Sequence, residues 1–388
     1  MKKADIFNDG YYKRNRILMT FFGLWPEYPQ SQMIFIQFCV LMLLLSIMLP
    51  QYAFICKMYK NIDELTAGLV EDMIVMLGIT YYYVFATNMD WVRFTINNMR
   101  KDWKTMERSS TIRIMHTYGK KGYSTTTFYL VMLYTATCLY ILLPMQAIIS
   151  DVITAANQSE SKLLIVKADY MIYGININNH YAAMLIHQLF EAVLLMSLIM
   201  TISTFMLIVV EHCCGLFVAV GELLQHVKGE FSTEQQDRII FEAVEVHQRA
   251  LTWADFIESL STVMYGVLVL ISMISISITG LQLIIRFNEP TEAVRFVACI
   301  GGQLVHLLFI SIPGQEIYDH SIRLSMEIYN CNWFEVSPKA KKSILMMLMN
   351  SAKPVYLTAG KFYVLSLESY GKVLKASFSF LTMMRSSR

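Results

Sequence analysis

Seven apolar runs of membrane length most constrain what this 388-residue chain can fold into. A transmembrane helix needs about 20 predominantly apolar residues, and each run supplies enough, allowing for tilt or for helix beyond the bilayer. The composition agrees, because 55% of the residues are hydrophobic and only 16% are charged. The sequence therefore predicts an all-α membrane protein with seven transmembrane helices, at residues 33–55, 65–86, 124–150, 181–210, 257–285, 296–312 and 355–384.

The distribution of basic residues predicts the orientation of these helices. Of the 32 Lys and Arg residues, twenty-one lie in the segments on the same side as the N-terminus, and eight lie in the segments on the other side. The positive-inside rule then gives a cytoplasmic N-terminus and an extracellular C-terminus. The sequon Asn157-Gln158-Ser159 falls in an extracellular loop, which makes Asn157 a candidate glycosylation site.

Two local signals indicate helices in the cytoplasmic segments. Ser232-Thr233-Glu234-Gln235 is typical of a capping box that opens a helix leading into the fifth span, and Ser337-Pro338-Lys339 precedes another helix. We expect these helices to pack into a cytoplasmic anchor domain. The predicted organisation is a cytoplasmic segment 1–32, transmembrane helices 1–4 in 33–210, a cytoplasmic helical segment 211–256, transmembrane helices 5 and 6 in 257–315, anchor helices 316–353, and the seventh helix with a short extracellular tail in 354–388.

No residue pattern indicates an enzyme, a metal site or a cofactor. The chain has no His-Glu-x-x-His, no Gly-x-Ser-x-Gly and no Walker-type glycine loop. Its seven cysteines show neither metal-ligand spacing nor a disulfide framework, and a formal charge of +2 gives no reason to expect nucleic acid. The densest intramembrane polar group is His187, Gln188 and Glu191, which fits either a functional site or hydrogen bonds between helices.

The last apolar run carries polar residues along one side. At about 3.6 residues per turn they fall within an arc of roughly 80°. An ionised lysine at mid-bilayer costs at least about 2.5 kcal/mol, so this side is expected to face water or protein, as a pore wall or as a packing seam. The polar residues are Lys361, Glu368, Lys372, Lys375, Ser379, Thr382 and Ser386.

Three strings resemble the insect odorant receptor family. The string TAGKFYVLSLESYGKVLKASFSFLTMMRS, which ends at Ser386, is similar to the C-terminal signature of that family. PGQEIYDHSIRLSMEIYNCNWFEVSPKAKKSILMMLMNSAKPVYLTAG, from Pro313 to Gly360, and FFGLWP, from Phe21 to Pro26, also match it. The resemblance covers nearly the whole chain, with its most specific strings near the C-terminus.

The resemblance implies a tuning subunit of an odorant-gated channel. Such a subunit binds a small volatile odorant within its transmembrane helices and gates a non-selective cation channel. The channel is a heterotetramer with the shared odorant co-receptor, and its subunits meet through the anchor helices. The implied location is the plasma membrane, multi-pass, in the dendrite of an olfactory sensory neuron. The co-receptor itself is disfavoured because it has a larger insertion between spans four and five than residues 211–256 allow.

Three other classes remain as alternatives. A gustatory-type receptor would be a homomeric channel for soluble tastants. A G-protein-coupled receptor is disfavoured because the predicted orientation is opposite and because the Asp-Arg-Tyr and Asn-Pro-x-x-Tyr motifs are absent. A transporter is disfavoured because the sequence shows no internal repeat.

The resemblance also implies two sets of site residues. In this family the odorant lies among spans two, three, four and six, which gives as candidate ligand-binding residues Met73, Ile74, Leu77, Tyr134, Cys138, Ile141, Met184, Gln188, Cys299 and Gln303. Each of them fits an ordinary bundle core equally well. The candidate pore residues, with Met383 near an outer constriction that closes by dewetting, are Lys372, Lys375, Ser379, Met383 and Ser386.

Overall fold

The computed structural model describes residues 5–8, 10–107, 109–153, 164–227 and 230–386, which fold almost wholly into helices. Six of the helices contain a stretch that is long and apolar enough to cross a membrane: α2, α3, α5, α6, α7 and α8. In chain order the α-helices are α1 (Lys13–Phe21), α2 (Gln30–Lys57), α3 (Ile62–Thr87), α4 (Met89–Met106), α5 (Ile112–Ile153), α6 (Ile177–Gln225), α7 (Thr233–Ile285), α8 (Pro290–Tyr329), α9 (Pro338–Ser351) and α10 (Leu367–Ser386).

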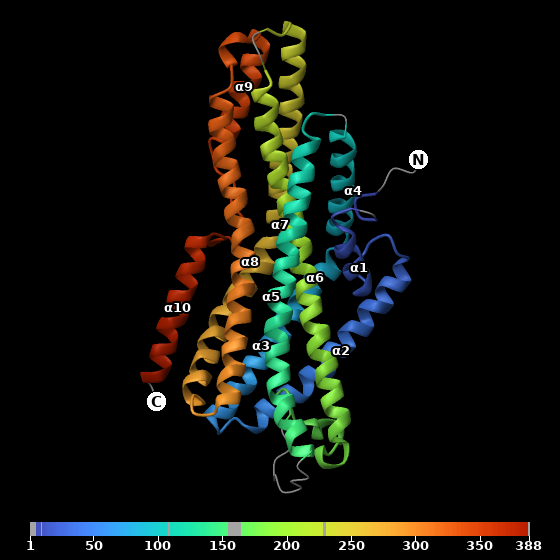
Figure 1. Ribbon diagram of the computed structural model, residues 1–388, viewed down its shortest axis with the longest axis vertical. Helices are drawn as coiled ribbons and strands as arrows, with labels where there is room; N and C mark the ends of the chain where they lie inside the picture. The colour runs from blue at the N-terminus through green and yellow to red at the C-terminus, as the bar shows by residue number, and fades with distance from the viewer. Residues whose placement is uncertain (1–4, 9, 108, 154–163, 228–229, 387–388) are drawn as a thin grey trace.

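The longest helices exceed the thickness of a bilayer. At about 1.5 Å per residue, α6 and α7 are about 74 and 80 Å long, against a hydrocarbon core of about 30 Å. Together with α5 and α8 they form the long axis of the molecule (Figure 1). The end at which α9 packs is called the α9 end, and the end with the α2–α3 and α7–α8 turns is called the loop end. About half of each longest helix therefore extends beyond the apolar layer.

Helix α6 forms the centre of the bundle. It packs against α3, α5, α7 and α8, and its residues are apolar around the whole helix, as expected where neighbours surround a helix on all sides. Phe205 and Phe217 are fully buried members of the main core cluster. Burying an aromatic side chain of this kind contributes about 1.5–3 kcal/mol each, so α6 is the element around which the others assemble.

The predicted caps are present. The Ser232 hydroxyl accepts from the Gln235 amide and the Gln235 side chain accepts from the Ser232 amide, and α7 continues without interruption to Ile285. The Ser337 hydroxyl accepts from the Ala340 amide at the start of α9. A short 3₁₀ helix, η2 (Trp333–Glu335), separates α8 from α9. The capping box and the continuous helix into the fifth span are confirmed.

A buried carboxylate fastens α4 to the bundle. Asp102 accepts from the Trp253 indole at 2.8 Å and from the Arg249 guanidinium at 3.0 Å, and it lies 3.1 Å from Nε2 of His212. Burial opposes ionisation of this carboxyl, but these donors outweigh it and hold the pKa of Asp102 below its usual range. The cluster joins α4 to both α6 and α7 on the side of the bundle away from α10.

The start of the last helix differs from the expectation. The predicted span begins at residue 355, whereas α10 begins at Leu367, after a two-stranded hairpin of β1 (Thr358–Ala359) and β2 (Tyr363–Val364). Gly360 and Lys361 both have a φ of 64°, a left-handed conformation that makes a turn and ends any helix. The Gly360 amide donates to the Thr262 carbonyl at 2.7 Å, which anchors the turn on α7. Lys361 therefore lies in a turn and not on the polar side of α10.

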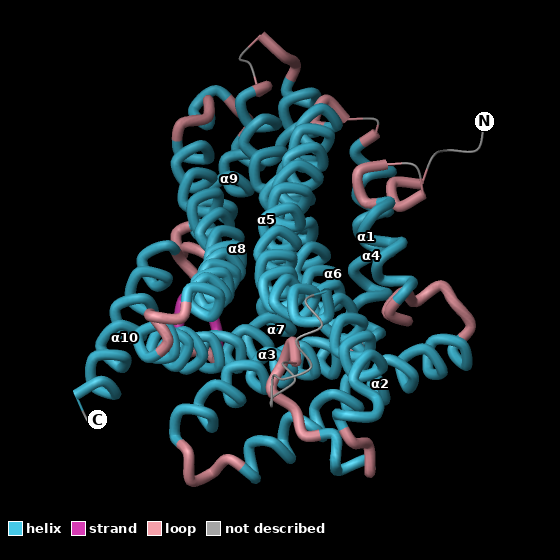
Figure 2. The backbone as a smooth tube through the Cα atoms, turned by 60° about the horizontal axis from the view of Figure 1, so that its bottom comes forward, coloured by secondary structure: helices cyan, strands magenta, loops and turns pink. Residues whose placement is uncertain are grey.

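Helix α10 stands apart from the other helices and touches the bundle along one narrow face (Figures 1 and 2). That face consists of Ser369, Val373 and Ser377, spaced four residues apart, which are its buried residues. The Ser277 hydroxyl of α7 donates to the Ser377 carbonyl at 3.1 Å. Small side chains at this spacing allow two helices to approach closely, so most of the surface of α10 is left uncovered by its own chain.

Candidate functional site

A cavity of about 150 Å³ lies inside the bundle, lined by residues of α2, α3, α5, α6, α7 and α8. An apolar cavity of about this volume holds a benzene-sized molecule in another protein. Its wall is mostly aliphatic, with a small number of polar side chains, which is the composition typical of small-molecule sites. The polar members are Gln51, Glu71, Thr137, Tyr140, Gln188, Glu191, Ser272, Ser275, Cys299, Gln303 and His306.

A buried ion pair lies at the loop end of the cavity. The Arg295 guanidinium on α8 pairs with the Glu71 carboxylate on α3, and both side chains are less than a tenth exposed. Arg295 also donates to the Tyr140 hydroxyl at 2.7 Å and to the Ile165 carbonyl at 2.6 Å. Because every charge here has a partner, the pair joins α3, α5 and α8 without leaving an unpaired buried ion.

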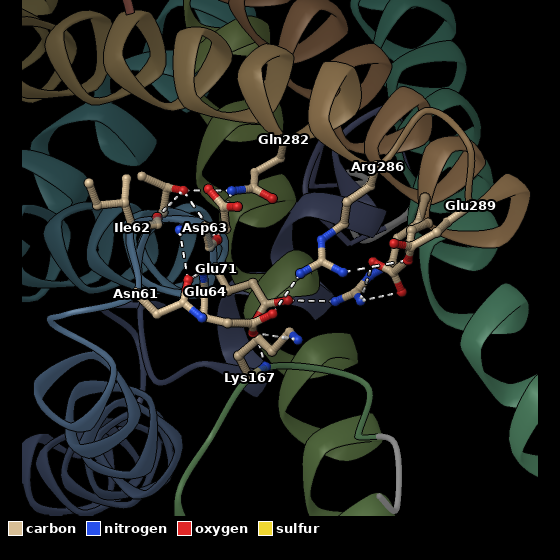
Figure 3. Close-up of polar contacts among 12 residues, drawn as sticks. Asn61, Ile62, Asp63, Glu64, Glu71, Lys167, Gln282, Arg286 and Glu289 are labelled. Carbon is tan, nitrogen blue, oxygen red and sulfur yellow. Dashed lines mark hydrogen bonds and ion pairs between the residues drawn. The ribbon is translucent and has the colours of Figure 1, made fainter. Parts of the chain in front are cut away.

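A second ionic cluster continues this network toward the solvent (Figure 3). Glu64 of α3 accepts from Lys167 at 2.9 Å and from Arg286 at 2.6 Å. Beside it, the Gln282 amide of α7 donates to the Asp63 carbonyl at 2.9 Å. These contacts tie the start of α3 to the end of α7.

The segment 164–173 closes the cavity at the loop end. The side chain of Gln188 on α6 accepts from the Val166 amide and donates to the Val166 carbonyl, each at 3.1 Å, in the pattern that a neighbouring strand makes. Val166 lines the cavity and Ile165 is fully buried. This segment includes the 3₁₀ helix η1 (Tyr170–Tyr173). It therefore acts as a cover whose backbone is held by side chains of the bundle.

Contacts with α2 and α6 hold the far side of the cover. The Asp169 amide donates to the Pro50 carbonyl at 2.8 Å, and the Asp169 carboxylate pairs with Lys57 at 2.8 Å. Partial burial opposes ionisation, but Lys57 and the Met171 amide hold the pKa of Asp169 below its usual range. The carboxylate therefore stays ionised and keeps the cover attached near neutral pH.

The cavity wall toward the α9 end contains a satisfied histidine. His306 of α8 lies 2.7 Å from the Tyr129 hydroxyl and 3.3 Å from the Tyr81 hydroxyl. Both tyrosines are fully buried. With both ring nitrogens partnered, His306 joins α3, α5 and α8 and is not free to bind a ligand through either nitrogen.

The structure brings seven of the ten predicted ligand-binding residues to this one cavity. They come from α3, α5, α6 and α8, and they are Met73, Ile74, Leu77, Ile141, Gln188, Cys299 and Gln303. Gln188 also holds the cover, so its role in the wall is partly structural. The arrangement groups these residues as a candidate site.

The other three predicted residues lie elsewhere. Tyr134 and Cys138 are exposed on the outer surface of α5, because the inward face of that helix carries Leu133, Thr137 and Tyr140 instead. The expected register of α5 is therefore displaced by one residue, which moves a side chain by about 100° around a helix. Met184 lines a separate pocket beside η1.

Several residues of the site were not among the predicted ones. Glu71 and Tyr140 form the polar end of the cavity, with Arg295 bound behind them, and Val166 of the cover lines it. A signal for the Glu71–Arg295 pair was present, since Glu71 lies within one apolar run and Arg295 directly before another, and opposite charges in such places usually pair inside a bundle. No local pattern marks Val166, because its position depends on a contact with a helix 22 residues away.

The predicted pore residues lie along the uncovered surface of α10. Lys372, Lys375, Ser379, Met383 and Ser386 are all exposed. Lys372 pairs with Glu368 at 2.6 Å, one turn nearer the start of the helix. Because α10 begins at Leu367, these two lysines lie within about 12 Å of its start, closer to the helix end than the predicted span places them. The candidate glycosylation site, Asn157, lies outside the described residues.

The fold is that of a multi-helix membrane protein with an internal, mainly apolar cavity. A family model described as 7tm Odorant receptor matches residues 73–378. This match covers well over half of the chain and includes the cavity helices and most of α10. The chain belongs to the 7tm odorant receptor family.

Curated insect receptors are similar to parts of the chain. Odorant receptor 9a of Drosophila melanogaster is 23% identical over 175 residues, which is 45% of this chain and 44% of that protein. Odorant receptor 10 of Aedes albopictus is 22% identical over 158 residues, which is 40% of this chain and 42% of that protein. The matched regions thus span less than half the length of either relative.

A solved insect receptor shares the complete fold. The structure of the olfactory receptor OR5 from Machilis hrabei in complex with eugenol matches with a TM-score of 0.76, covering 97% of both chains at 14% identity. A second structure of OR5 from the same species matches with a TM-score of 0.75 at 13% identity. At this level of identity the likeness shows the fold alone.

Proposed function

We propose that this chain is an odorant receptor subunit that binds a small volatile molecule in the cavity and gates a cation channel formed with co-receptor subunits in the plasma membrane. The observation that carries the proposal is the internal, mainly aliphatic cavity of about 150 Å³ in a chain of this family. Such a wall stabilises small apolar molecules by removing them from water. The receptor OR5, whose structure is in complex with eugenol, provides a precedent for a small aromatic ligand.

Helix α7 offers a short connection from the cavity to the proposed pore helix. Ser272 and Ser275 line the cavity, and two residues after Ser275 the Ser277 hydroxyl donates to the Ser377 carbonyl of α10. A ligand that binds one arrangement of α7 more tightly than another shifts the equilibrium between them. In this mechanism the small-residue contact between α7 and α10 transmits that shift to the pore.

A mixed assembly suits the charges on α10. Lys372 and Lys375 are exposed on the surface that would face a central pore. Four identical subunits would place four copies of each lysine around that pore, and their positive charges would repel cations at short range. A heteromer with fewer copies of this chain has a weaker positive field. The proposal therefore includes co-receptor subunits rather than a homomeric channel.

Current recordings from cells that express the chain with and without the co-receptor test this proposal. We expect odorant-evoked cation current only from the co-expressing cells, and we expect it to persist when G proteins are blocked. Ala136→Phe should reduce the response by filling the cavity, whereas Thr135→Phe, on the exposed side of the same helix, should leave it nearly unchanged. Current that needs G proteins, or that is equally large without the co-receptor, would contradict the proposal.

A further inference from the structure

The cavity wall contains a carboxylate with no donor. Glu191 of α6 lines the cavity and is 2% exposed, and neither of its carboxylate oxygens has a hydrogen-bond partner among the described residues. A buried carboxylate without a donor is costly, because its charge or its lone pairs have lost their contacts with water. The other wall carboxylate, Glu71, differs in having Arg295 as its partner.

The remaining unpartnered atoms of the wall have the same hydrogen-bonding character. They are Oε1 of Gln51 and Oε1 of Gln303, both carbonyl oxygens. The Gln303 amide nitrogen already donates to the Ser275 hydroxyl at 2.8 Å, which fixes its oxygen as the free atom. Among the described residues of the wall, the buried polar atoms that lack a partner are therefore all acceptors.

Two donors of the wall are used within the protein. The Tyr140 hydroxyl donates to Glu71 at 3.0 Å, and the Gln188 side-chain amide donates to the Val166 carbonyl at 3.1 Å. A molecule that enters the cavity can supply the donor that Glu191 lacks. As an ionised carboxylate Glu191 has acceptor atoms only, whereas a protonated carboxyl would also donate, so the requirement for a donor belongs to the ionised form.

We infer that the ligand of this cavity is a small, mainly apolar molecule whose polar group is a hydrogen-bond donor, a hydroxyl or an amine, that pairs with Glu191. This inference rests on the proposed function. The aliphatic wall holds the carbon skeleton, and the donor decides which skeletons bind well. A molecule of the same shape with only acceptor atoms leaves Glu191 unpartnered and places a second acceptor beside it, which sites of this kind discriminate against strongly.

The test compares volatile molecules that differ only in the polar group. Cells that express the chain with the co-receptor receive benzyl alcohol, benzylamine, anisole and benzaldehyde, and then hexanol, hexylamine and hexanal, after a broad volatile panel has established the response range. We expect the alcohol or the amine of a set to activate at a concentration at least about tenfold lower than the acceptor-only members, the ratio that one hydrogen bond to such a group supplies. Equal or better activation by the acceptor-only members would overturn the inference.

Glu191→Gln supplies the matched variant. The amide keeps the shape of the side chain but adds a donor, so the tenfold preference should fall to about threefold or less. Glu222→Gln, on the same helix and far outside the cavity, should keep the full preference. An unchanged preference in the Glu191 variant would show that water satisfies this carboxylate and would overturn the inference.

The remaining outcome concerns the proposed function. If surface labelling shows normal amounts of the chain and no compound of any chemical group evokes current, the proposed function fails, and this inference fails with it. Activation by acceptor-only compounds with no donor preference overturns the inference alone. If the Glu191 variant does not reach the cell surface, the activating concentrations of the donor and acceptor-only compounds on the unmodified chain decide whether the inference holds.

Discussion

The Glu71–Arg295 pair illustrates how a single buried charge depends on its partner. Replacing Arg295 with Met should lower the free energy of unfolding by about 3–5 kcal/mol, because it leaves the Glu71 carboxylate buried and uncompensated. Thermal unfolding of the purified protein in detergent measures the effect. Replacing both residues, Glu71→Leu with Arg295→Met, should recover most of the loss.

The matched control for this prediction is Glu292→Gln. Glu292 also lies beside Arg295, at 3.4 Å, but it is about a quarter exposed, and solvent screens the interaction. Its loss should change the unfolding temperature only slightly. A loss as large as that of Arg295→Met would show that the deep pair is not the main electrostatic contact at this end of the bundle.

The pH dependence of stability tests the Asp102 cluster. The usual pKa of an aspartate is about 3.9, and the folded protein holds that of Asp102 lower. Because the folded pKa is the lower one, its stabilisation is fully present above about pH 4–5 and is lost as the pH falls through the folded pKa. Asp102→Asn should therefore cost about 1–3 kcal/mol at pH 7 and progressively less below pH 4.

Unfolding temperatures of both proteins between pH 7 and pH 3 give this comparison. Asp90→Asn is the control, since Asp90 lies on the same helix and pairs with Arg93 but is almost fully exposed. It should have little effect at any pH. A cost of Asp102→Asn that does not change with pH would mean that the carboxylate charge is unimportant and only the shape of the side chain matters.

Individual residues of the site were only partly predictable from the sequence. The family resemblance selected apolar wall residues on α3 and α8, such as Met73 and Cys299, that do line the cavity. On α5 the same resemblance selected Tyr134, which is exposed, and the sequence could not correct it because a long apolar helix shows no clear inward face when lipid and protein are equally apolar. Contacts such as Gln188 with the Val166 backbone depend on the tertiary fold.

At the scale of elements, the exposed and buried faces of α10 predict which of its positions react with thiol reagents. Cysteine at Ser379, Met383 or Ser386, all exposed, should react with thiol reagents added from the outside and change the odorant-evoked current. Cysteine at Ser377 should not, since that side chain packs against α7. The unmodified chain needs parallel treatment, because Cys56 and Cys138 are themselves exposed.

The faces of α10 identify the outcome that would contradict a pore role. Phe378 is apolar but 71% exposed, so it faces a neighbouring subunit or lipid and not its own bundle. If Ser379 and Phe378 variants respond alike, the polar side of α10 is a packing seam. A response at Ser377 would mean that α10 separates from α7 when the channel opens.

Elements differ in how well the sequence predicts them. The capping box at Ser232 predicts the start of α7 because the signal is local, four residues long and chemically specific. The hairpin before α10 was missed because its strands are two residues each and are stabilised by distant partners. The Thr358 amide donates to Glu258 at 2.7 Å and the Gly360 amide donates to Thr262, both on α7. Without those partners the apolar segment from residue 355 is typical of a continuous helix.

At the scale of the whole molecule, the number of membrane crossings decides the positions of the termini. Six helices contain an obvious span, and α10, with 20 residues, is about 30 Å long, just enough for a seventh. It is less hydrophobic than the other six helices because it carries Glu368, Lys372 and Lys375. If α10 crosses the membrane, the number of crossings is odd and the two termini lie on opposite sides.

Charge then decides which terminus is inside. The long helices continue to the α9 end (Figure 1), and the basic residues there, including Lys339, Lys341 and Lys342, favour the cytoplasm. We therefore expect an epitope tag at Met1 to be stained only after permeabilisation and a tag at Arg388 to be stained on intact cells. Tags on the same side would show that α10 does not span the membrane. An N-terminal tag stained on intact cells, with a C-terminal tag stained only after permeabilisation, would show the opposite orientation, in which the basic α9 end faces outward.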